Sequence, residues 1–379
     1  MTLVAVVRFV LEKQHESISY DSYVNRLQQL LDSKKITIEH FDHFKSRGIE
    51  IIRPLKDFGL SSLGRILPEI VIGASYEFIK RMKIPYQATS FLVANTKSNM
   101  NGWYVYKIPE QPKGGLILLS GGKRRLGDNI FASTHRIILG RKAILVSAVN
   151  LMANKNNIWN WHFFGDHLKQ DNESLYNDLV KLETILNRNV DSTNNMKRNS
   201  PHYYIIIARS ESTFKKLEIV GNYLQNKIAV LNPENNIHTI FVTNKSGFDF
   251  ASKRIEESSL VSYIATGENF DLYQGMQILK RKYGIDMILN DGGRIMSDGV
   301  RREGLLGEER MSLEPFPGED IFPPDKYIDP TTVAGSQGLG LDGSEIEGSI
   351  LLHSINIEDE KLNVYIYPLE ERKVLQSQG

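Results

Sequence analysis

Hydrophobic and polar positions follow two different patterns along this chain. Near the amino end, apolar residues recur every three to four positions, as in Tyr20–Leu31, which is typical of helices that bury one face. From about Pro85 onward, short apolar runs of strand length alternate with helical patterns and glycine-bearing loops. These runs are Leu116–Leu119, Ala143–Ala148, Tyr203–Ala208, Thr239–Thr243 and Asp286–Asn290. Their continuous apolarity indicates strands buried on both faces, as in a mainly parallel sheet covered by helices.

Candidate helices lie between these strands, and the end of the chain has a different character. The helical patterns cover Asp128–Gly140, Phe214–Asn226 and Asp271–Tyr283. In the amino-terminal part, Thr37 is a predicted N-cap of a helix that we expect to end at Gly48. Ser349–Ile357 and Lys361–Tyr367 have the alternation of an antiparallel hairpin. The pattern therefore predicts an α/β fold, with a mixed, mainly parallel twisted sheet flanked by helices and a closing antiparallel C-terminal hairpin.

The change of texture near Pro85 predicts two parts. Residues 1–84 are expected to form a helical N-terminal extension, and residues 85–379 the α/β domain.

Two segments show no clear pattern of helix or strand. Asn187–Pro201 is polar and rich in Asn, which is typical of a mobile surface loop. Pro315–Gly348 is rich in Pro and Gly, and such a long connection is usually a functional lid or a mobile segment.

Composition narrows the range of functions. The 379 residues contain 46 Lys and Arg against 45 Asp and Glu, so the net charge is close to zero. Nucleic acid could therefore bind only at a local basic patch. The absence of cysteine excludes disulfides, Fe–S clusters, thiolate nucleophiles and the zinc deaminase motif. The apolar start Met1–Leu11 carries Arg8 and has none of the features of a signal peptide, and no run reaches the length of a membrane span. We therefore expect a soluble, cytoplasmic protein.

The most specific local motif is Asn290-Asp291-Gly292-Gly293-Arg294, which follows a predicted strand and precedes a helical pattern. Two glycines allow the backbone to approach a ligand, and the helix start offers N–H donors and a partial positive charge. Asp291 could bind a sugar or amine group. We favour a ligand site here over a plain turn because ligands lie at strand ends in α/β sheets.

Three other motifs carry less weight. Ser120-Gly-Gly-Lys-Arg-Arg suits a phosphate-bearing ligand and a solvated turn equally well. Gly338-Leu-Gly340-Leu-Asp-Gly343 matches a dinucleotide motif, but it lies in a loop that runs into a strand. His40 and His43 could ligate a metal, but they lack a third ligand, so we favour a solvated helix face and expect no metal.

Two blocks, Ser120–Asn154 and Asp286–Pro315, resemble the reductase domain of the bifunctional riboflavin-biosynthesis deaminase/reductase. The first block carries the family features at Lys123, Gly127, His135-Arg136 and Ala143–Val146. The second has a strand, an acidic residue, paired glycines and a helix. The likeness runs from about Pro85 to Leu369, with an insertion at about 157–200. It implies a dihydrofolate-reductase-like fold, a homodimer, and NADPH as the hydride donor.

The resemblance also implies which residues hold the cofactor. The family binds it at the turn after the Ala-Ile-Leu-Val strand, which here consists of Ser147, Ala148, Val149 and Asn150. Arg209 and Ser210 stand where the 2′-phosphate of NADPH is gripped, and an arginine beside a hydroxyl suits a dianionic phosphate. Gly292, Gly293 and Arg294 complete the expected cofactor site.

The implied substrate is a ribosylamino-pyrimidinone 5′-phosphate whose opened ribose is reduced to a ribityl chain. Asn154 and Asp291 match the family's catalytic positions, and Lys123 and Asn101 its substrate-binding positions, with Lys123 at the phosphate. Side chains at Ser147 and Val149 replace the family's glycine-rich turn, and Asn154 stands where the family has an acidic residue. These three substitutions motivate a second hypothesis. It is a non-catalytic relative that binds a nucleotide or partner as a regulator. Reduction of a pterin or another carbonyl compound is a third. We expect a small-molecule ligand and neither nucleic acid nor membrane as a partner.

Overall fold

The computed structural model describes eleven segments of the chain. These are residues 20–56, 74–95, 103–104, 126–139, 142–148, 168–170, 172–194, 201–226, 236–315, 348–357 and 360–367. The predicted strand Leu116–Leu119, the motif Gly338–Gly343 and most of the loop Pro315–Gly348 lie outside them. Every structural statement below concerns the described residues.

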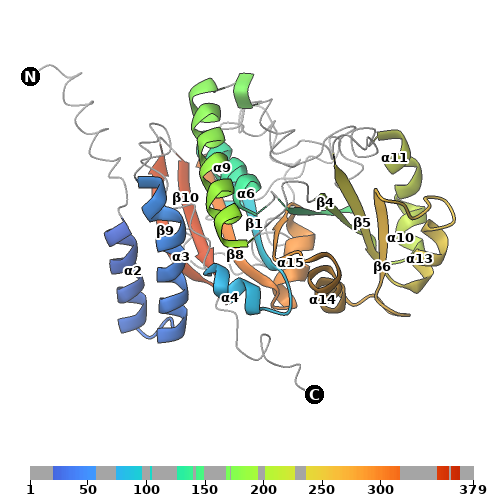
Figure 1. Cartoon of the computed structure of the whole chain (residues 1–379), viewed down its shortest axis with the longest axis horizontal. Coiled ribbons are helices and arrows are strands. Elements are labelled where there is room, and N and C mark those ends of the chain that lie inside the picture. The colour runs from blue at the N-terminus through green and yellow to red at the C-terminus, as the bar shows by residue number, and fades with distance from the viewer. Residues whose placement is uncertain are drawn as a thin grey trace, which may run out of the picture.

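One mixed sheet organises the described part of the chain (Figure 1). Its strands are β1 (Tyr86–Asn95), β2 (Trp103–Tyr104), β3 (Ala143–Ser147), β4 (His202–Ile207), β5 (Ile237–Thr243), β6 (Val261–Ala265), β7 (Met287–Asn290), β8 (Leu306–Pro315), β9 (Ile350–Ile357) and β10 (Glu360–Ile366). They follow the order β6-β5-β4-β3-β7-β1-β8-β10-β9, and β2 pairs with β1. All neighbours from β6 to β8 are parallel, whereas β10 is antiparallel to both β8 and β9. The predicted fold class is confirmed.

Helices cover both faces of this sheet. The helices are α2 (Tyr20–Asp32), α3 (Ile38–Lys56), α4 (Tyr76–Arg81), α6 (Leu126–Ile138), α9 (Glu173–Asn194), α10 (Glu211–Lys216), α11 (Ile219–Asn226), α13 (Lys245–Ala251), α14 (Leu272–Tyr283) and α15 (Arg294–Arg302). His135 of α6 bonds Ser90 of β1, while Ser297 of α15 bonds the adjacent Thr89. Because successive strand residues point to opposite faces, α6 and α15 lie on opposite sides of β1.

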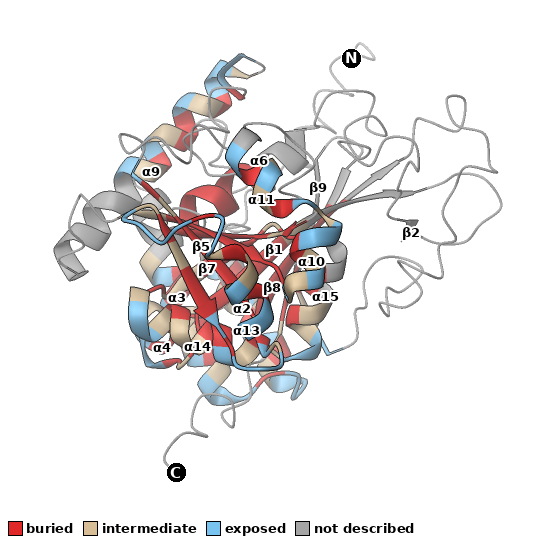
Figure 2. Cartoon of the chain, turned by 90° about the vertical axis from the view of Figure 1, so that its right-hand side faces the viewer, coloured by how far each residue is buried: buried red, intermediate tan, exposed pale blue. Residues whose placement is uncertain are grey.

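The same alternation separates the helices over the other half of the sheet. Phe214 of α10 and Tyr223 of α11 contact Phe241 of β5. A Cβ on Gly275 of α14 would lie 2.8 Å from the next residue, Val242. Helices α10 and α11 therefore cover the face that α6 covers, and α14 covers the other. Figure 2 shows the consequence, with buried residues concentrated along the central strands.

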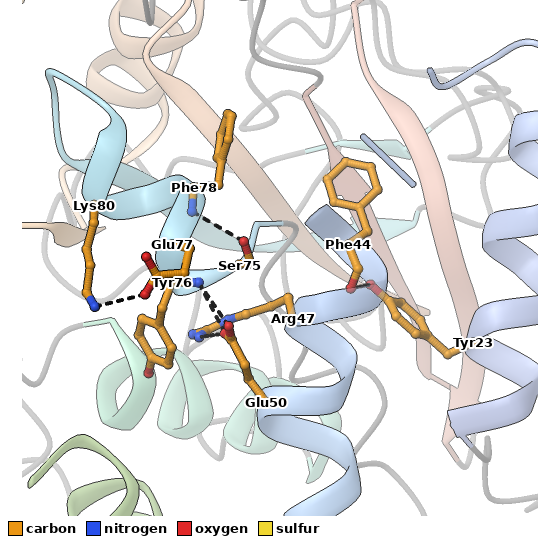
Figure 3. A network of polar contacts seen from close by, with 9 residues as sticks. All are labelled: Tyr23, Phe44, Arg47, Glu50, Ser75, Tyr76, Glu77, Phe78 and Lys80. Atoms are coloured by element: carbon orange, nitrogen blue, oxygen red, sulfur yellow. Dashed lines mark hydrogen bonds and ion pairs between the residues drawn. The ribbon is translucent and has the colours of Figure 1, made fainter. Parts of the chain in front are cut away.

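Helices α2 and α3 pack as an antiparallel pair, as the amino-terminal pattern predicts, and their apolar stripe joins the main hydrophobic core. Arg47 of α3 is fully buried. It donates to Glu50 at 3.0 Å, its guanidinium lies 3.8 Å from the ring centre of Tyr76, and Glu50 accepts from the Tyr76 backbone N–H (Figure 3). This polar link joins α3 to α4. The division of the chain at residue 84 stays a prediction.

Three local predictions are wrong. Helix α3 continues through Gly48 to Lys56, because Gly48 serves close packing: a Cβ there would lie 2.8 Å from Tyr23. The predicted helix Phe214–Asn226 is two helices, since Glu218 adopts a left-handed φ of 46° between them. Residues 187–194 of the expected loop are helical. Once the stripe of Leu175, Leu179 and Leu182 has nucleated α9, each further residue adds a hydrogen bond.

Candidate functional site

The carboxyl ends of β4, β3 and β7 lie side by side at one edge of the sheet, because these strands are adjacent and parallel. From β3 the chain moves to β4 on one side, and from β7 it moves past β1 to β8 on the other. In open α/β sheets, such a reversal of direction creates the crevice in which ligands bind. The described residues of the predicted site lie at the ends of these three strands: Ser147 at the end of β3 and Ala148 after it, Arg209 and Ser210 after β4, and Asp291, Gly292 and Gly293 after β7.

The turn after β7 has the strand–turn–helix form that its sequence predicts. The Asp291 N–H donates to the Leu145 carbonyl at 2.8 Å, which continues the pairing of β7 with β3. The Asn290 side-chain oxygen accepts from the Gly292 N–H at 3.0 Å. Gly293 has φ of 76° and ψ of 177°, a conformation that is essentially restricted to glycine, and α15 begins at the next residue.

The two glycines of this turn have different roles. A Cβ on Gly292 would lie 2.5 Å from the Met296 side chain, so this glycine allows the first turn of α15 to pack against the strand end. Gly293 instead meets a backbone requirement. The absence of a side chain at Gly292 is thus already explained by packing, and Gly293 is explained by its backbone conformation at the helix start.

Asp291 is held by an arginine that the sequence analysis did not assign to the site. Arg136 of α6 donates from Nη2 to the Asp291 carboxylate at 3.1 Å and from Nη1 to the Ala132 carbonyl at 2.8 Å. The Arg136 side chain is 4% exposed and that of Asp291 is 30% exposed. The negative charge of Asp291 also reaches the interior, because burial and then Asp291 raise the pKa of Tyr204 on β4. The carboxylate therefore lies at the border between core and solvent.

The other described site residues line the ends of β3 and β4. Ser147 is partly buried and Ala148 is buried at the end of β3. Arg209 is exposed, with its guanidinium carbon 5.8 Å from the Phe270 ring centre and Nη2 3.9 Å from where a Cβ of Gly299 in α15 would lie. Ser210 is the N-cap of α10, but its side chain makes no capping hydrogen bond. Arg209 therefore projects toward the helix that begins at the paired glycines.

Five predicted site residues lie outside the described residues. They are Asn101, Lys123, Val149, Asn150 and Asn154. Arg294 is the first residue of α15, but its side chain is also outside the described part. The catalytic role of Asn154, the substrate contacts of Lys123 and Asn101 and the cofactor roles of this set stay predictions.

A buried polar network lies directly behind Arg136. His135, the preceding residue of α6, hydrogen-bonds Ser90 through Nδ1 at 2.8 Å and Glu308 through Nε2 at 3.3 Å. Arg310 donates from Nε to Glu308 at 2.7 Å and from Nη1 to Thr134 at 3.3 Å. His135, Glu308 and Arg310 are all fully buried. Glu308 and Arg310 are two positions apart on β8, but the other bonded partners are 45 to 176 positions apart, so no local motif could have revealed the network.

The charges in this network are fixed by burial and by neighbours. Burial, and then Arg310, lower the pKa of His135 to about 4, against the opposing effect of Glu308. Burial raises the pKa of Glu308, but Arg310 and His135 outweigh that effect and hold its pKa below the usual value. Glu308 is therefore ionised at neutral pH and accepts from His135 Nε2, which leaves Nδ1 to accept from Ser90. A base this weak does not support nucleophilic catalysis by Ser90.

Metal and membrane features are absent from the described residues. No group of three or more His, Asp or Glu side chains among them could hold a metal ion. His43 hydrogen-bonds Glu39 at 3.3 Å and packs on Phe78, with ring centres 4.3 Å apart. No helix in this part of the chain is both long and apolar enough to cross a bilayer.

Comparisons with known proteins give structural likenesses at low sequence identity. RibD from Acinetobacter baumannii has 14% identity and a TM-score of 0.38 over 75% of this chain and 58% of its own. The riboflavin biosynthesis reductase Rib7 of Saccharomyces cerevisiae has 12% identity and a TM-score of 0.38, covering 75% and 90%. A pyrimidine reductase-like protein from Corynebacterium diphtheriae has 12% identity and a TM-score of 0.41, covering 74% and 91%.

The chain thus spans less than two thirds of the length of the RibD protein that it resembles. No protein-family model matches the sequence. No curated protein matches it either. With TM-scores below 0.5, these likenesses add no argument about activity, and the fold class rests on the strand order given above.

Proposed function

We propose that this protein is an NADPH-dependent reductase of the pyrimidine-reductase type, which transfers hydride to the opened ribose of a ribosylamino-pyrimidinone 5′-phosphate. The observation that supports it best is the turn Asp291-Gly292-Gly293 at the reversal point of the sheet. A carboxylate, a glycine-only backbone conformation and a helix start follow one another there. This combination suits a dinucleotide beside a polar substrate.

Each group would have a separate task in this reaction. NADPH would supply the hydride, and the protein would supply position and electrostatic field. The start of α15 would face the diphosphate, and Arg209 would pair with the 2′-phosphate. Asp291, with Arg136 at one side of its carboxylate, would accept hydrogen bonds from the amine or hydroxyl groups of the substrate.

A titration of the full chain with NADPH and with NADH, followed by nicotinamide fluorescence, tests the cofactor assignment. Arg209→Ala should weaken NADPH binding by roughly tenfold to a hundredfold, as expected when a charge-assisted hydrogen bond is lost, and leave NADH binding nearly unchanged. Arg254→Ala is a matched control. Arg254 is also exposed and stacks on a phenylalanine, Phe250, at 3.7 Å, but follows α13 at the opposite end of the strands.

The outcomes separate the candidate functions. NADPH binding with turnover of the pyrimidine phosphate supports the reductase. Binding without turnover of that compound or of a pterin or carbonyl substrate supports the non-catalytic regulator, which is the second candidate because side chains replace the family's glycine-rich turn at Ser147. Equal losses of NADPH and NADH in Arg209→Ala contradict the phosphate grip. No binding of either nucleotide overturns the proposal.

A further inference from the structure

Three consecutive residues of α6 tie this helix to three different strands. Thr134 accepts from Arg310 of β8, His135 bonds Ser90 of β1 and Glu308 of β8, and Arg136 reaches Asp291 at the end of β7. Side chains on successive helical residues point about 100° apart, so one turn of α6 presents polar groups in three directions. The rotation of α6 about its axis is therefore set by directional bonds, whereas apolar packing alone would tolerate small rotations.

Arg136 is held rigidly as a result. The preceding residue, His135, is hydrogen-bonded to two strands, which restrains the backbone at Arg136. Nη1 of Arg136 also donates to the Ala132 carbonyl one turn earlier. The remaining contact to Asp291 joins a 4%-exposed guanidinium to a 30%-exposed carboxylate. The buried guanidinium thus contacts the carboxylate from the core side, and the rest of the carboxylate faces solvent. This arrangement can orient the carboxylate toward a ligand.

We propose that Arg136 is a positioning residue for the turn after β7, holding the Asp291 carboxylate in a fixed orientation toward the bound substrate. This proposal rests on the proposed function for the identity of the ligand, but the pairing itself can be measured without any ligand. Arg136 acts through Asp291, and the network of His135, Glu308 and Arg310 keeps Arg136 in place.

The absence of cysteine allows a direct test. In an Asp291→Cys variant the new thiol is the only one in the chain, so its ionisation can be followed by thiolate absorbance. Among the described residues, Arg136 of α6 and Tyr204 of β4 both act on this position. With Arg136 present, the thiol pKa should lie about 1 unit or more below that in the Arg136→Met background, because a nearby cation favours the thiolate.

Conservative and distant variants show whether the effect belongs to charge at this site. Arg136→Lys should keep most of the lowering, since it keeps the cation. A control thiol made by Ser33→Cys, exposed in the turn after α2, should have the same pKa whether Arg136 is present or replaced by methionine. Equal thiol pKa values at position 291 in the Arg136 and Arg136→Met backgrounds would overturn the proposal, since an arginine that does not act on position 291 leaves the ionisation unmoved.

A second measurement covers a failure of Asp291→Cys to fold. Arg136→Met, Asp291→Asn and the double variant form a cycle in urea unfolding. Coupling predicts that the unfolding equilibrium constant of the double variant departs at least twofold to threefold from the product of the single effects. Effects that multiply independently would count against the pair.

Ligand protection separates this proposal from the proposed function. NADPH together with the pyrimidine phosphate should slow alkylation of the thiol at position 291 and leave the Ser33→Cys control unaffected. If the pKa difference appears without protection, the positioning pair stands and the ligand assignment fails. If protection appears without a pKa difference, the crevice is right and the role of Arg136 is wrong.

Discussion

The two halves of the sheet are held together by different chemistry. Over β5 and β6 the core is aromatic, with the ring centre of Phe241 5.9 Å from Phe214, 5.2 Å from Tyr223 and 5.4 Å from Tyr263. Between β1, β8 and α6 the core contains the fully buried His135, Glu308 and Arg310. One half thus relies on apolar area and ring packing, and the other on charges that must remain paired.

This difference predicts where the molecule is sensitive. Apolar packing degrades gradually when a side chain is trimmed, whereas a buried ion that loses its partner keeps its full desolvation cost. The charged half also borders the crevice through Arg136, so damage there should affect both stability and the site.

Glu308→Leu should destabilise the protein by about 3–5 kcal/mol, because it leaves the buried guanidinium of Arg310 without its carboxylate. Urea unfolding followed by circular dichroism measures this loss. The double variant Glu308→Leu/Arg310→Met should recover much of it, since no buried charge then remains unpaired. A double variant that is less stable than Glu308→Leu alone would show that the two residues do not act as a pair.

Acid should destabilise the charged half through His135. The pKa of His135 is about 4 in the folded protein and about 6.5 in the unfolded chain, so below pH 6.5 the unfolded state binds the proton first. Stability therefore falls as the pH drops from 6.5 toward 4. Between pH 7 and 4.5 the wild type should lose about 2 kcal/mol more than His135→Gln, which cannot titrate. If the wild type and His135→Gln lose the same free energy of unfolding between pH 7 and pH 4.5, as measured by urea unfolding, the low pKa of His135 is contradicted.

Tyr223→Phe should cost about 1 kcal/mol, because it removes the buried hydrogen bond of 2.9 Å from Tyr223 to Thr239. The cost should be the same at pH 4.5 and pH 7, since burial raises the pKa of Tyr223 to about 12 and it stays neutral at both. Thermal and urea unfolding at the two pH values measure this. A clear pH dependence would mean that the aromatic half also depends on titrating groups.

Lys245→Met should leave the unfolding midpoint unchanged. Lys245 forms an ion pair of 2.9 Å with Glu268, but both side chains are largely exposed, and solvent screens such pairs. The comparison with Glu308→Leu at low and high salt isolates the effect of burial on an ion pair. A large shift for Lys245→Met would show that exposure does not distinguish the two pairs.

The sequence alone was sufficient for four of the parallel strands and for the turn after β7. Strands β3, β4, β5 and β7 were found because both of their faces are apolar, and such a run has few alternative structures. The turn was found because two glycines follow a strand, and the φ of 76° at Gly293 shows that one of them meets a local backbone requirement. The terminal hairpin was also found, because alternation is a local property.

Only the tertiary structure revealed β1, β8 and the groups around Asp291. Strand β8 has the sequence Leu-Gly-Glu-Glu-Arg-Met-Ser, in which Glu308 and Arg310 resemble surface residues. In the folded protein the two side chains pair with each other, and Glu308 also contacts His135. Gly307 has a similar explanation, since the ring of Tyr86 occupies the space of its missing side chain, 2.3 Å from where a Cβ would lie. Arg136 reaches Asp291 across 155 positions. The pattern along the chain indicates whether a residue is buried and which backbone conformation it requires. The partner of a buried charge depends instead on which distant strand the fold places next to it.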